Sequence, residues 1–168
     1  ALAFAARDGR TVLAQRRHEG PLVVQKPLYP EGARVCHAII VHPPAGMVGG
    51  DALDIAVDAG DGVHALVTTP GAGKWYGSRG LRATQRVAGR ACDGSVVAWS
   101  PQEPILSGGT RARMEVDVTL AGAAVFVGME IICFGRTATG ERFADGEVVF
   151  STRIARDGAL LWCERGDV

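Results

Sequence analysis

Residues 111–120 read RARMEVDVTL, and the alternation within this stretch decides the fold class. Met114, Val116, Val118 and Leu120 recur at every second position, and the polar residues 115, 117 and 119 lie between them. A β-strand turns successive side chains to opposite faces, so this period of two predicts a strand with one apolar face and one polar face.

Working outward from this strand, short apolar segments of the same kind recur along the chain, separated by Gly, Pro and Asp. Asp157 and Gly158 lie between the last two of them and suit a tight hairpin, because this pair accepts positive φ angles. We see no internal repeat of fixed period, so the pattern leaves open an all-β sandwich, a barrel or a solenoid of stacked strands. The other segments expected to be strands are 11–17, 35–42, 52–58, 63–69, 95–100, 147–155 and 159–165.

One apolar segment, AAVFVGMEIICF at 123–134, is compatible with either a buried pair of strands or a buried helix. Glu130 is its only charged residue. Since an isolated carboxylate is strongly disfavoured inside a protein, we expect Glu130 to have a partner or to lie where water reaches it.

The composition excludes several classes of protein. The 168 residues suit a single domain, and 18 basic residues balance 18 acidic ones. A net charge of zero argues against a nucleic-acid-binding protein and against a basic membrane-binding patch. No apolar run approaches the ~20 residues that span a bilayer, and we find no signal peptide. We therefore expect a cytoplasmic protein whose four cysteines are reduced, buried thiols, and a disulfide is the alternative.

The stretch TTPGAGKWYGSRG at 68–80 superficially resembles a phosphate-binding loop. The Walker A pattern requires a glycine where this chain has Thr68, and a Ser or Thr where it has Trp75. Pro70 also removes a backbone N–H from a loop that would have to supply such groups to the phosphates. We conclude that the loop does not bind a nucleotide.

The histidines and cysteines do not form a metal-binding motif. Cys36 and His42 would share a face of one strand, but they stand about 20 Å apart at ~3.3 Å per residue. A tetrahedral site with zinc-like spacing is therefore absent, although a transient site assembled from distant segments stays open. No motif for a serine or cysteine nucleophile is present either.

Four carboxylates are candidate functional groups, and three of them lie beside apolar residues or tight glycine turns. They are Asp51 in GMVGGD, Glu103 in SPQEPI, Glu130, and Glu164 in LLWCER. Three of them also have a structural explanation: Asp51 as a turn cap, Glu103 in a loop hydrogen bond, and Glu164 in an ion pair with a cation such as Arg165.

Taken together, the loops resemble those of the urease accessory protein UreD, called UreH in some species. The resemblance covers nearly the whole chain, and HPPAGMVGGD (42–51) and TTPGAGKWY (68–76) are its most specific blocks. The other matching blocks are GPLVVQKPLYPEG (20–32), HALVTTPGAGKWYGS (64–78), WSPQEPI (99–105), FVGMEIICFGR (126–136), GERF (140–143) and LLWCER (160–165).

The resemblance implies a mostly-β fold of stacked, superhelical antiparallel sheets, β-helix-like or a sandwich, with few helices. It implies a scaffold, and not an enzyme, that binds apo-urease and the UreF–UreG pair, of which UreG is the GTPase. No cofactor is held tightly. Nickel(II) passes through transiently along an internal path, for which we predict Asp51, Ser78, Glu130 and Glu164, with Glu103 a weaker candidate.

The chain also departs from the family pattern. The segment PILSGGT (104–110) carries smaller residues than the family usually has there, and the family extends well beyond the position of Val168. We therefore expect a single domain over 1–168 that lacks the C-terminal part of the family. The alternative function is a β-fold enzyme or a module that binds a small ligand.

Overall fold

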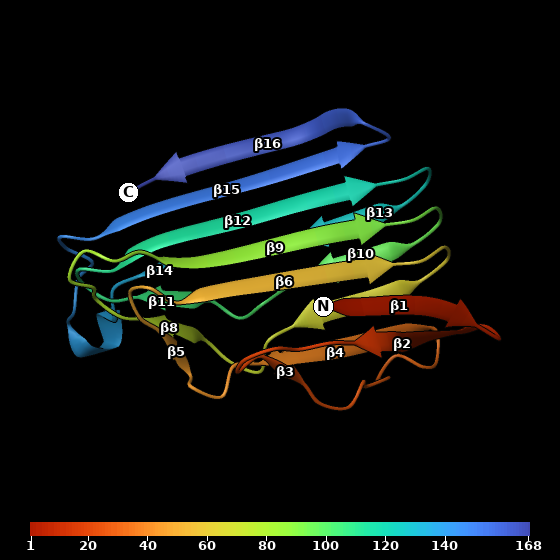
Figure 1. Cartoon of the computed structure of the whole chain (residues 1–168), viewed down its shortest axis with the longest axis horizontal. Helices are drawn as coiled ribbons and strands as arrows, with labels where there is room; N and C mark the ends of the chain where they lie inside the picture. The colour runs from red at the N-terminus through yellow and green to blue at the C-terminus, as the bar shows by residue number, and fades with distance from the viewer.

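The computed structural model describes residues 1–168, and strands make up almost all of its regular structure (Figure 1). The only helix is a short 3-10 turn, η1 (Thr137–Thr139), and the structure has no helix with the length and apolar character that crossing a membrane requires. The strands are β1 (Leu2–Arg7), β2 (Arg10–Arg16), β3 (Val23–Val24), β4 (Val35–Val41), β5 (Gly46–Met47), β6 (Ala52–Ala59), β7 (His64–Thr68), β8 (Gly73–Trp75), β9 (Ala83–Ala91), β10 (Val96–Trp99), β11 (Pro104–Leu106), β12 (Arg111–Leu120), β13 (Val125–Gly128), β14 (Cys133–Phe134), β15 (Glu147–Arg156) and β16 (Ala159–Asp167).

From β4 onward the chain winds as a β-solenoid. Each coil contributes one strand to each of three sheets, in the order β4–β5–β6, β7–β8–β9, β10–β11–β12 and β13–β14–β15. The resulting sheets have seven strands (β16-β15-β12-β9-β6-β1-β2), five strands (β13-β10-β7-β4-β3) and four strands (β14-β11-β8-β5). In Figure 1 the long seven-stranded sheet faces the viewer and the two shorter sheets lie behind it. The predicted stacked, mostly-β fold is confirmed.

The predicted antiparallel pairing is wrong for most of the strands. Only β1–β2, β3–β4 and β15–β16 are antiparallel, and every other pair is parallel. The physical reason is that each strand returns to its sheet after a full coil and therefore runs in the same direction as the strand before it. The hairpin predicted at Asp157 and Gly158 does form, with φ angles of 47° and 84°.

The coils also show a repeat that we did not detect in the sequence. Their first strands begin at residues 35, 64, 96 and 125, which gives spacings of 29, 32 and 29 residues. The turns that end the first three coils each place a glycine at positive φ: Gly62 at 64°, Gly94 at 64° and Gly122 at 53°. Other positions vary because an inward site accepts any apolar side chain of suitable size, and so the repeat shows mainly in these turns.

Alternation along the long strands separates the core from a charged outer face. Met114, Val116, Val118 and Leu120 of β12 are all buried, as their spacing predicts. The opposite face of the same sheet carries ion pairs between neighbouring strands, including Arg90–Asp58 at 2.7 Å and Arg86–Glu115 at 2.9 Å. All eight segments expected to be strands contain one, whereas six strands were not predicted: β1, β3, β5, β8, β9 and β11.

The ambiguous segment 123–134 forms the two short strands β13 and β14, and no helix. It is also less buried than we predicted, because β13 and β14 are edge strands of their sheets. Val127 and Ile131 are 55% and 59% exposed.

Close packing between the loops of successive coils leads to a stability prediction at Gly77. A Cβ atom added at Gly77 would lie 2.6 Å from the carbonyl oxygen of Gly108, and a backbone atom cannot move aside easily. We expect Gly77→Ala to lower the free energy of unfolding by about 1–3 kcal/mol, measured by urea denaturation. Gly71→Ala is the control, because a Cβ atom there would meet nothing within 4 Å. Equal stability of the two variants would contradict the predicted clash.

Candidate functional site

The main cavity lies where the seven-stranded sheet meets the junction of the two shorter sheets, and its volume is about 420 Å³. The loops that follow β4, β7 and β10 line it, and each of these loops contributes a proline: Pro43, Pro70 and Pro101. Two indole rings, those of Trp75 and Trp99, form part of the wall. The polar side chains along it are His42, Thr69, Lys74, Gln85, Gln102 and Glu130.

A second cavity of about 410 Å³ adjoins the first one. The two cavities share the lining residues Leu22, Ile40, Leu53 and Ile55, so apolar side chains form their common boundary. The charged and polar residues that line the second cavity include Arg17, His18 and Glu19. Together the two cavities follow the inner face of the seven-stranded sheet near the starts of β1 and β6.

Glu130 lines the main cavity and has the partner that we predicted. It follows the end of β13, and the indole Nε1–H of Trp99 donates a hydrogen bond of 3.0 Å to its Oε1. Burial raises the pKa of the Glu130 carboxyl, and the hydrogen bond from Trp99 opposes this by lowering it. The Oε2 atom has no hydrogen-bond partner within the protein.

Asp51 and Ser78 lie on neighbouring loops, away from the two cavities. The Oδ2 atom of Asp51 accepts a hydrogen bond of 2.9 Å from the backbone N–H of Val48, which is the turn-capping role considered above. The hydroxyl of Ser78 donates to the carbonyl oxygen of Leu81. A Cβ atom on Gly49 would overlap Ser78, so the glycine allows these two loops to pack closely.

Glu164 and Glu103 do not line the cavities either. Glu164 is exposed on the edge strand β16, opposite Thr152 of β15, and makes no ion pair with Arg165. The carbonyl oxygen of Glu103 accepts a hydrogen bond of 3.0 Å from the N–H of Gly73, so its backbone holds β8 against β11. Of the four residues predicted for a metal path, Glu130 alone lines the cavities, and the assignment of all four to such a path stays a prediction.

The aromatic part of the site was not predicted from the sequence. Trp75 and Trp99 are only 2% and 3% exposed, yet both reach the main cavity. A signal was present in the sequence, because both tryptophans occupy equivalent positions: each ends a strand close to a proline-containing loop. His42, which we had considered only as one of a pair of metal ligands with Cys36, also lines this cavity.

No group of three or more His, Cys, Asp or Glu side chains is arranged to hold a metal ion. His37 instead lies 2.6 Å from the Glu31 carboxylate. All four cysteines are free, but only Cys36 is buried, and Cys163 is exposed. The prediction of buried thiols is therefore wrong for the other three cysteines.

Lys74, the residue that suggested a phosphate-binding loop, lies on a strand. It belongs to β8, which is paired with β5 on one side and β11 on the other. The strand ladder uses the backbone groups that a phosphate would need, so the segment lacks the open cradle of a P-loop.

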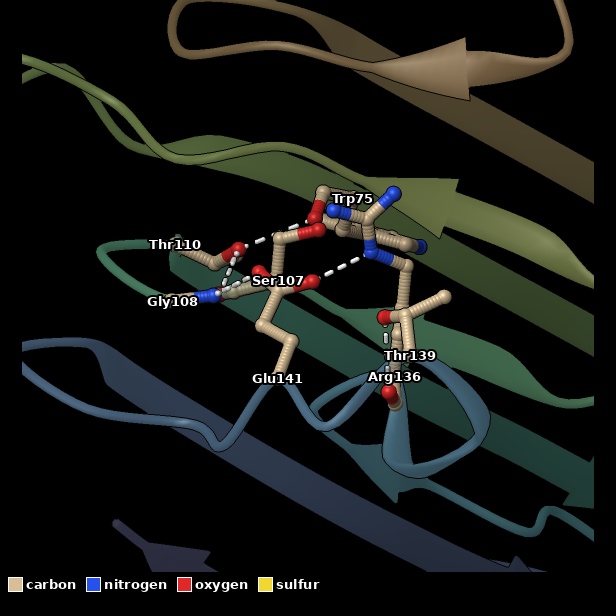
Figure 2. A network of polar contacts seen from close by, with 7 residues as sticks. All are labelled: Trp75, Ser107, Gly108, Thr110, Arg136, Thr139 and Glu141. Atoms are coloured by element: carbon tan, nitrogen blue, oxygen red, sulfur yellow. Dashed lines mark hydrogen bonds and ion pairs between the residues drawn. The ribbon is translucent and has the colours of Figure 1, made fainter.

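A polar network ties the loop that carries η1 to the third coil (Figure 2). The Oε1 atom of Glu141 accepts a hydrogen bond of 3.0 Å from the N–H of Gly108, and its Oε2 atom accepts one from the Arg136 guanidinium. These contacts, that of Arg136 foremost, lower the pKa of the Glu141 carboxyl. Beside them, the buried Thr110 hydroxyl lies 2.9 Å from the carbonyl oxygen of Trp75, so the network also supports the cavity wall.

Comparison with known proteins agrees with the resemblance in the loops. The family model described as UreD urease accessory protein matches residues 1–168. This chain belongs to the UreD family. It is 58% identical to the urease accessory protein UreD of Azoarcus sp. (strain BH72) over 169 residues, which cover 99% of this chain and 59% of that protein.

Two further UreD proteins give the same result. That of Dechloromonas aromatica (strain RCB) is 51% identical over 98% of this chain and 57% of its own length. That of Janthinobacterium sp. (strain Marseille) is 52% identical over 98% of this chain and 56% of its own length. The chain thus spans less than three-fifths of the length of these UreD relatives.

Proposed function

We propose that this UreD-family chain is a non-catalytic scaffold in urease maturation and that its two adjoining cavities carry nickel(II) toward apo-urease. The observation that carries the proposal is the single half-buried carboxylate, Glu130, on the wall of a mainly apolar cavity that adjoins a second one. Its partners would be apo-urease and the UreF–UreG pair, in the cytoplasm. Nickel is the cargo of this scaffold and not a resident cofactor.

The chemistry of the cavity suits transient binding. Nickel(II) accepts carboxylate, imidazole and water ligands, and the main cavity offers one carboxylate at Glu130 and one imidazole at His42. A cluster of three or more ligands would retain the ion, and the chain has none. One carboxylate oxygen without a protein partner can hold a hydrated ion weakly and release it onward.

Asp51, Ser78 and Glu164 extend the proposal beyond the cavities. Asp51 and Ser78 lie on adjacent loops at one end of the long sheet, and Glu164 lies on its exposed edge strand. We assign them to the points where the passage meets a partner protein, since their oxygens are not enclosed by this chain.

Co-purification tests the scaffold role. The tagged chain should retain apo-urease together with UreF and UreG, and urease activity should rise with added nickel. A complete UreD relative serves as the reference, because this chain spans 59% of the length of the Azoarcus protein. If the chain retains none of these proteins while the complete relative does, then residues 1–168 are not sufficient for the scaffold.

A second candidate function is a module that binds a small ligand. The main cavity, at about 420 Å³ with two indole rings, falls within the usual size range of ligand sites. Under this alternative, an organic cation with apolar groups would raise the thermal stability of the chain, and Glu130→Gln would abolish that increase. The nickel passage predicts no such stabilisation.

A further inference from the structure

We propose that Trp99 is a positioning residue for Glu130: its indole N–H holds one carboxylate oxygen, so that the other is left for a passing divalent cation. This inference rests on the proposed function for its ligand. The contact itself is the 3.0 Å hydrogen bond from Trp99 Nε1 to Glu130 Oε1. Both residues line the same cavity.

The solenoid holds Trp99 firmly enough to position another side chain. Trp99 ends β10, is 3% exposed, and is paired with Val67 of β7 on one side and with Gly128 of β13 on the other. Its backbone carbonyl also accepts a hydrogen bond of 2.9 Å from the N–H of Met129. One tryptophan therefore holds residues 129 and 130 through both its main chain and its side chain.

Glycine at position 128 leaves room for this arrangement. A Cβ atom there would lie 2.9 Å from the ring of Phe126, which packs inward beside the end of β13. Glycine at this position therefore lets the Phe126 ring stay where it packs. The carboxylate position is thus set by the preceding strand and by the indole together.

Electrostatics explain why the hydrogen bond is needed. Burial disfavours the charged form of Glu130, and a protonated carboxyl is a poor ligand for a divalent cation. The indole N–H favours the charged form through its hydrogen bond to Oε1, and Oε2 is left without a protein partner. His42 after β4 and Lys74 on β8 are the other titratable side chains on the cavity wall, and neither is hydrogen-bonded to Glu130.

The experiment compares Trp99→Phe with Trp75→Phe. Trp75 lines the same cavity and is equally buried, but its indole is not hydrogen-bonded to Glu130, so it is a matched control. The Glu130 carboxyl is titrated by carbon NMR, with its resonance assigned from its absence in Glu130→Gln. We expect the Glu130 pKa to rise in Trp99→Phe and to stay at the wild-type value in Trp75→Phe.

Nickel binding supplies the second readout. Loss of a hydrogen bond to a charged group should weaken nickel(II) binding at pH 7 roughly tenfold in Trp99→Phe, measured by calorimetry with the metal alone. A wild-type Glu130 titration in Trp99→Phe, or an equal shift in Trp75→Phe, would overturn the positioning role. A shifted titration in a protein that binds no nickel would refute the passage while leaving the Trp99–Glu130 coupling intact.

A third measurement applies if Trp99→Phe does not fold. In the wild-type chain the indole proton of Trp99 should change its chemical shift with pH at the midpoint of the Glu130 titration. The same proton should show no such titration in Glu130→Gln. An indole resonance that does not respond to pH in the wild-type chain would overturn the proposal without any tryptophan variant.

Discussion

Replacing Glu130 with glutamine should lower the nickel-dependent activation of urease roughly tenfold at limiting nickel, because charge-assisted contacts contribute about 1.5–3 kcal/mol. The variant keeps the size of the side chain and an oxygen that can accept the hydrogen bond of Trp99 Nε1. Only the charge is lost, and the charge is what attracts the cation. The measurement is urease activity after co-expression of the complete accessory set at matched protein levels.

The stability of this variant should not fall, which separates loss of function from loss of fold. Burial raises the pKa of Glu130 above its ordinary value of about 4.5, so the folded chain binds a proton more tightly than the unfolded chain does. The stabilising contribution is complete below the ordinary pKa and is lost as the pH rises through the raised value. Above that range the glutamine variant should be at least as stable as the wild type.

Glu103→Gln is the control for this prediction. Glu103 lies in the loop after β10, close in sequence to the lining residues Gln102 and Pro104, yet its side chain does not line the cavity. The Glu103→Gln variant should activate urease to the same level as the wild type does. If Glu130→Gln activates urease as well as Glu103→Gln does, then Glu130 has no part in nickel transfer.

Replacing Leu106 with alanine should cost about 2–5 kcal/mol of unfolding free energy, since it removes a large side chain from a site that cannot collapse. Leu106 is 0% exposed on β11 and is paired with Trp75 on one side and Phe134 on the other. It belongs to the smaller core cluster of the solenoid, together with Met47 and Met114. Urea denaturation measures the loss.

Leu81→Ala is the matched control, because Leu81 is 65% exposed and should contribute less than about 0.5 kcal/mol. The Leu106→Ala substitution should also widen the main cavity, because Trp75, which is paired with Leu106, is part of the cavity wall. If Leu106→Ala lowers the unfolding free energy by less than about 1 kcal/mol, then the side chains between successive coils repack freely, and the coils are not stacked in one fixed arrangement.

Local features of the fold were predictable from the chain. The alternation at Met114–Leu120 predicted both the strand and its buried face, because period two depends only on the geometry of consecutive residues. The strand β9 was missed since its inward residues include the small Ala83 and Ala91, separated by polar residues and glycine. Small side chains weaken the apolar signal without weakening the pairing.

For the site, the sequence indicated that the Glu130 carboxylate needed a partner, and the structure identified this partner as Trp99. A lone carboxylate in an apolar run had to be satisfied, and this physical rule identified Glu130. Trp99 lies 31 residues away in the chain, one coil earlier, so no local pattern could connect the two. The resemblance led us to assign Asp51, Ser78 and Glu164 to the same path as Glu130, but the fold places them apart from the cavities that Glu130 lines.

The sequence by itself determined where eight of the strands lie, which face of β6 and of β12 is apolar, and the membership in the UreD family. These properties depend on neighbouring residues and on specific loop blocks, all of which are present in the linear chain. Only the tertiary structure decided that most strands pair in parallel, that about 30 residues make one coil, and that Trp99 meets Glu130. Strand direction and contacts between coils depend on how the chain returns after a full turn, and residues one coil apart are neighbours only once the solenoid has formed.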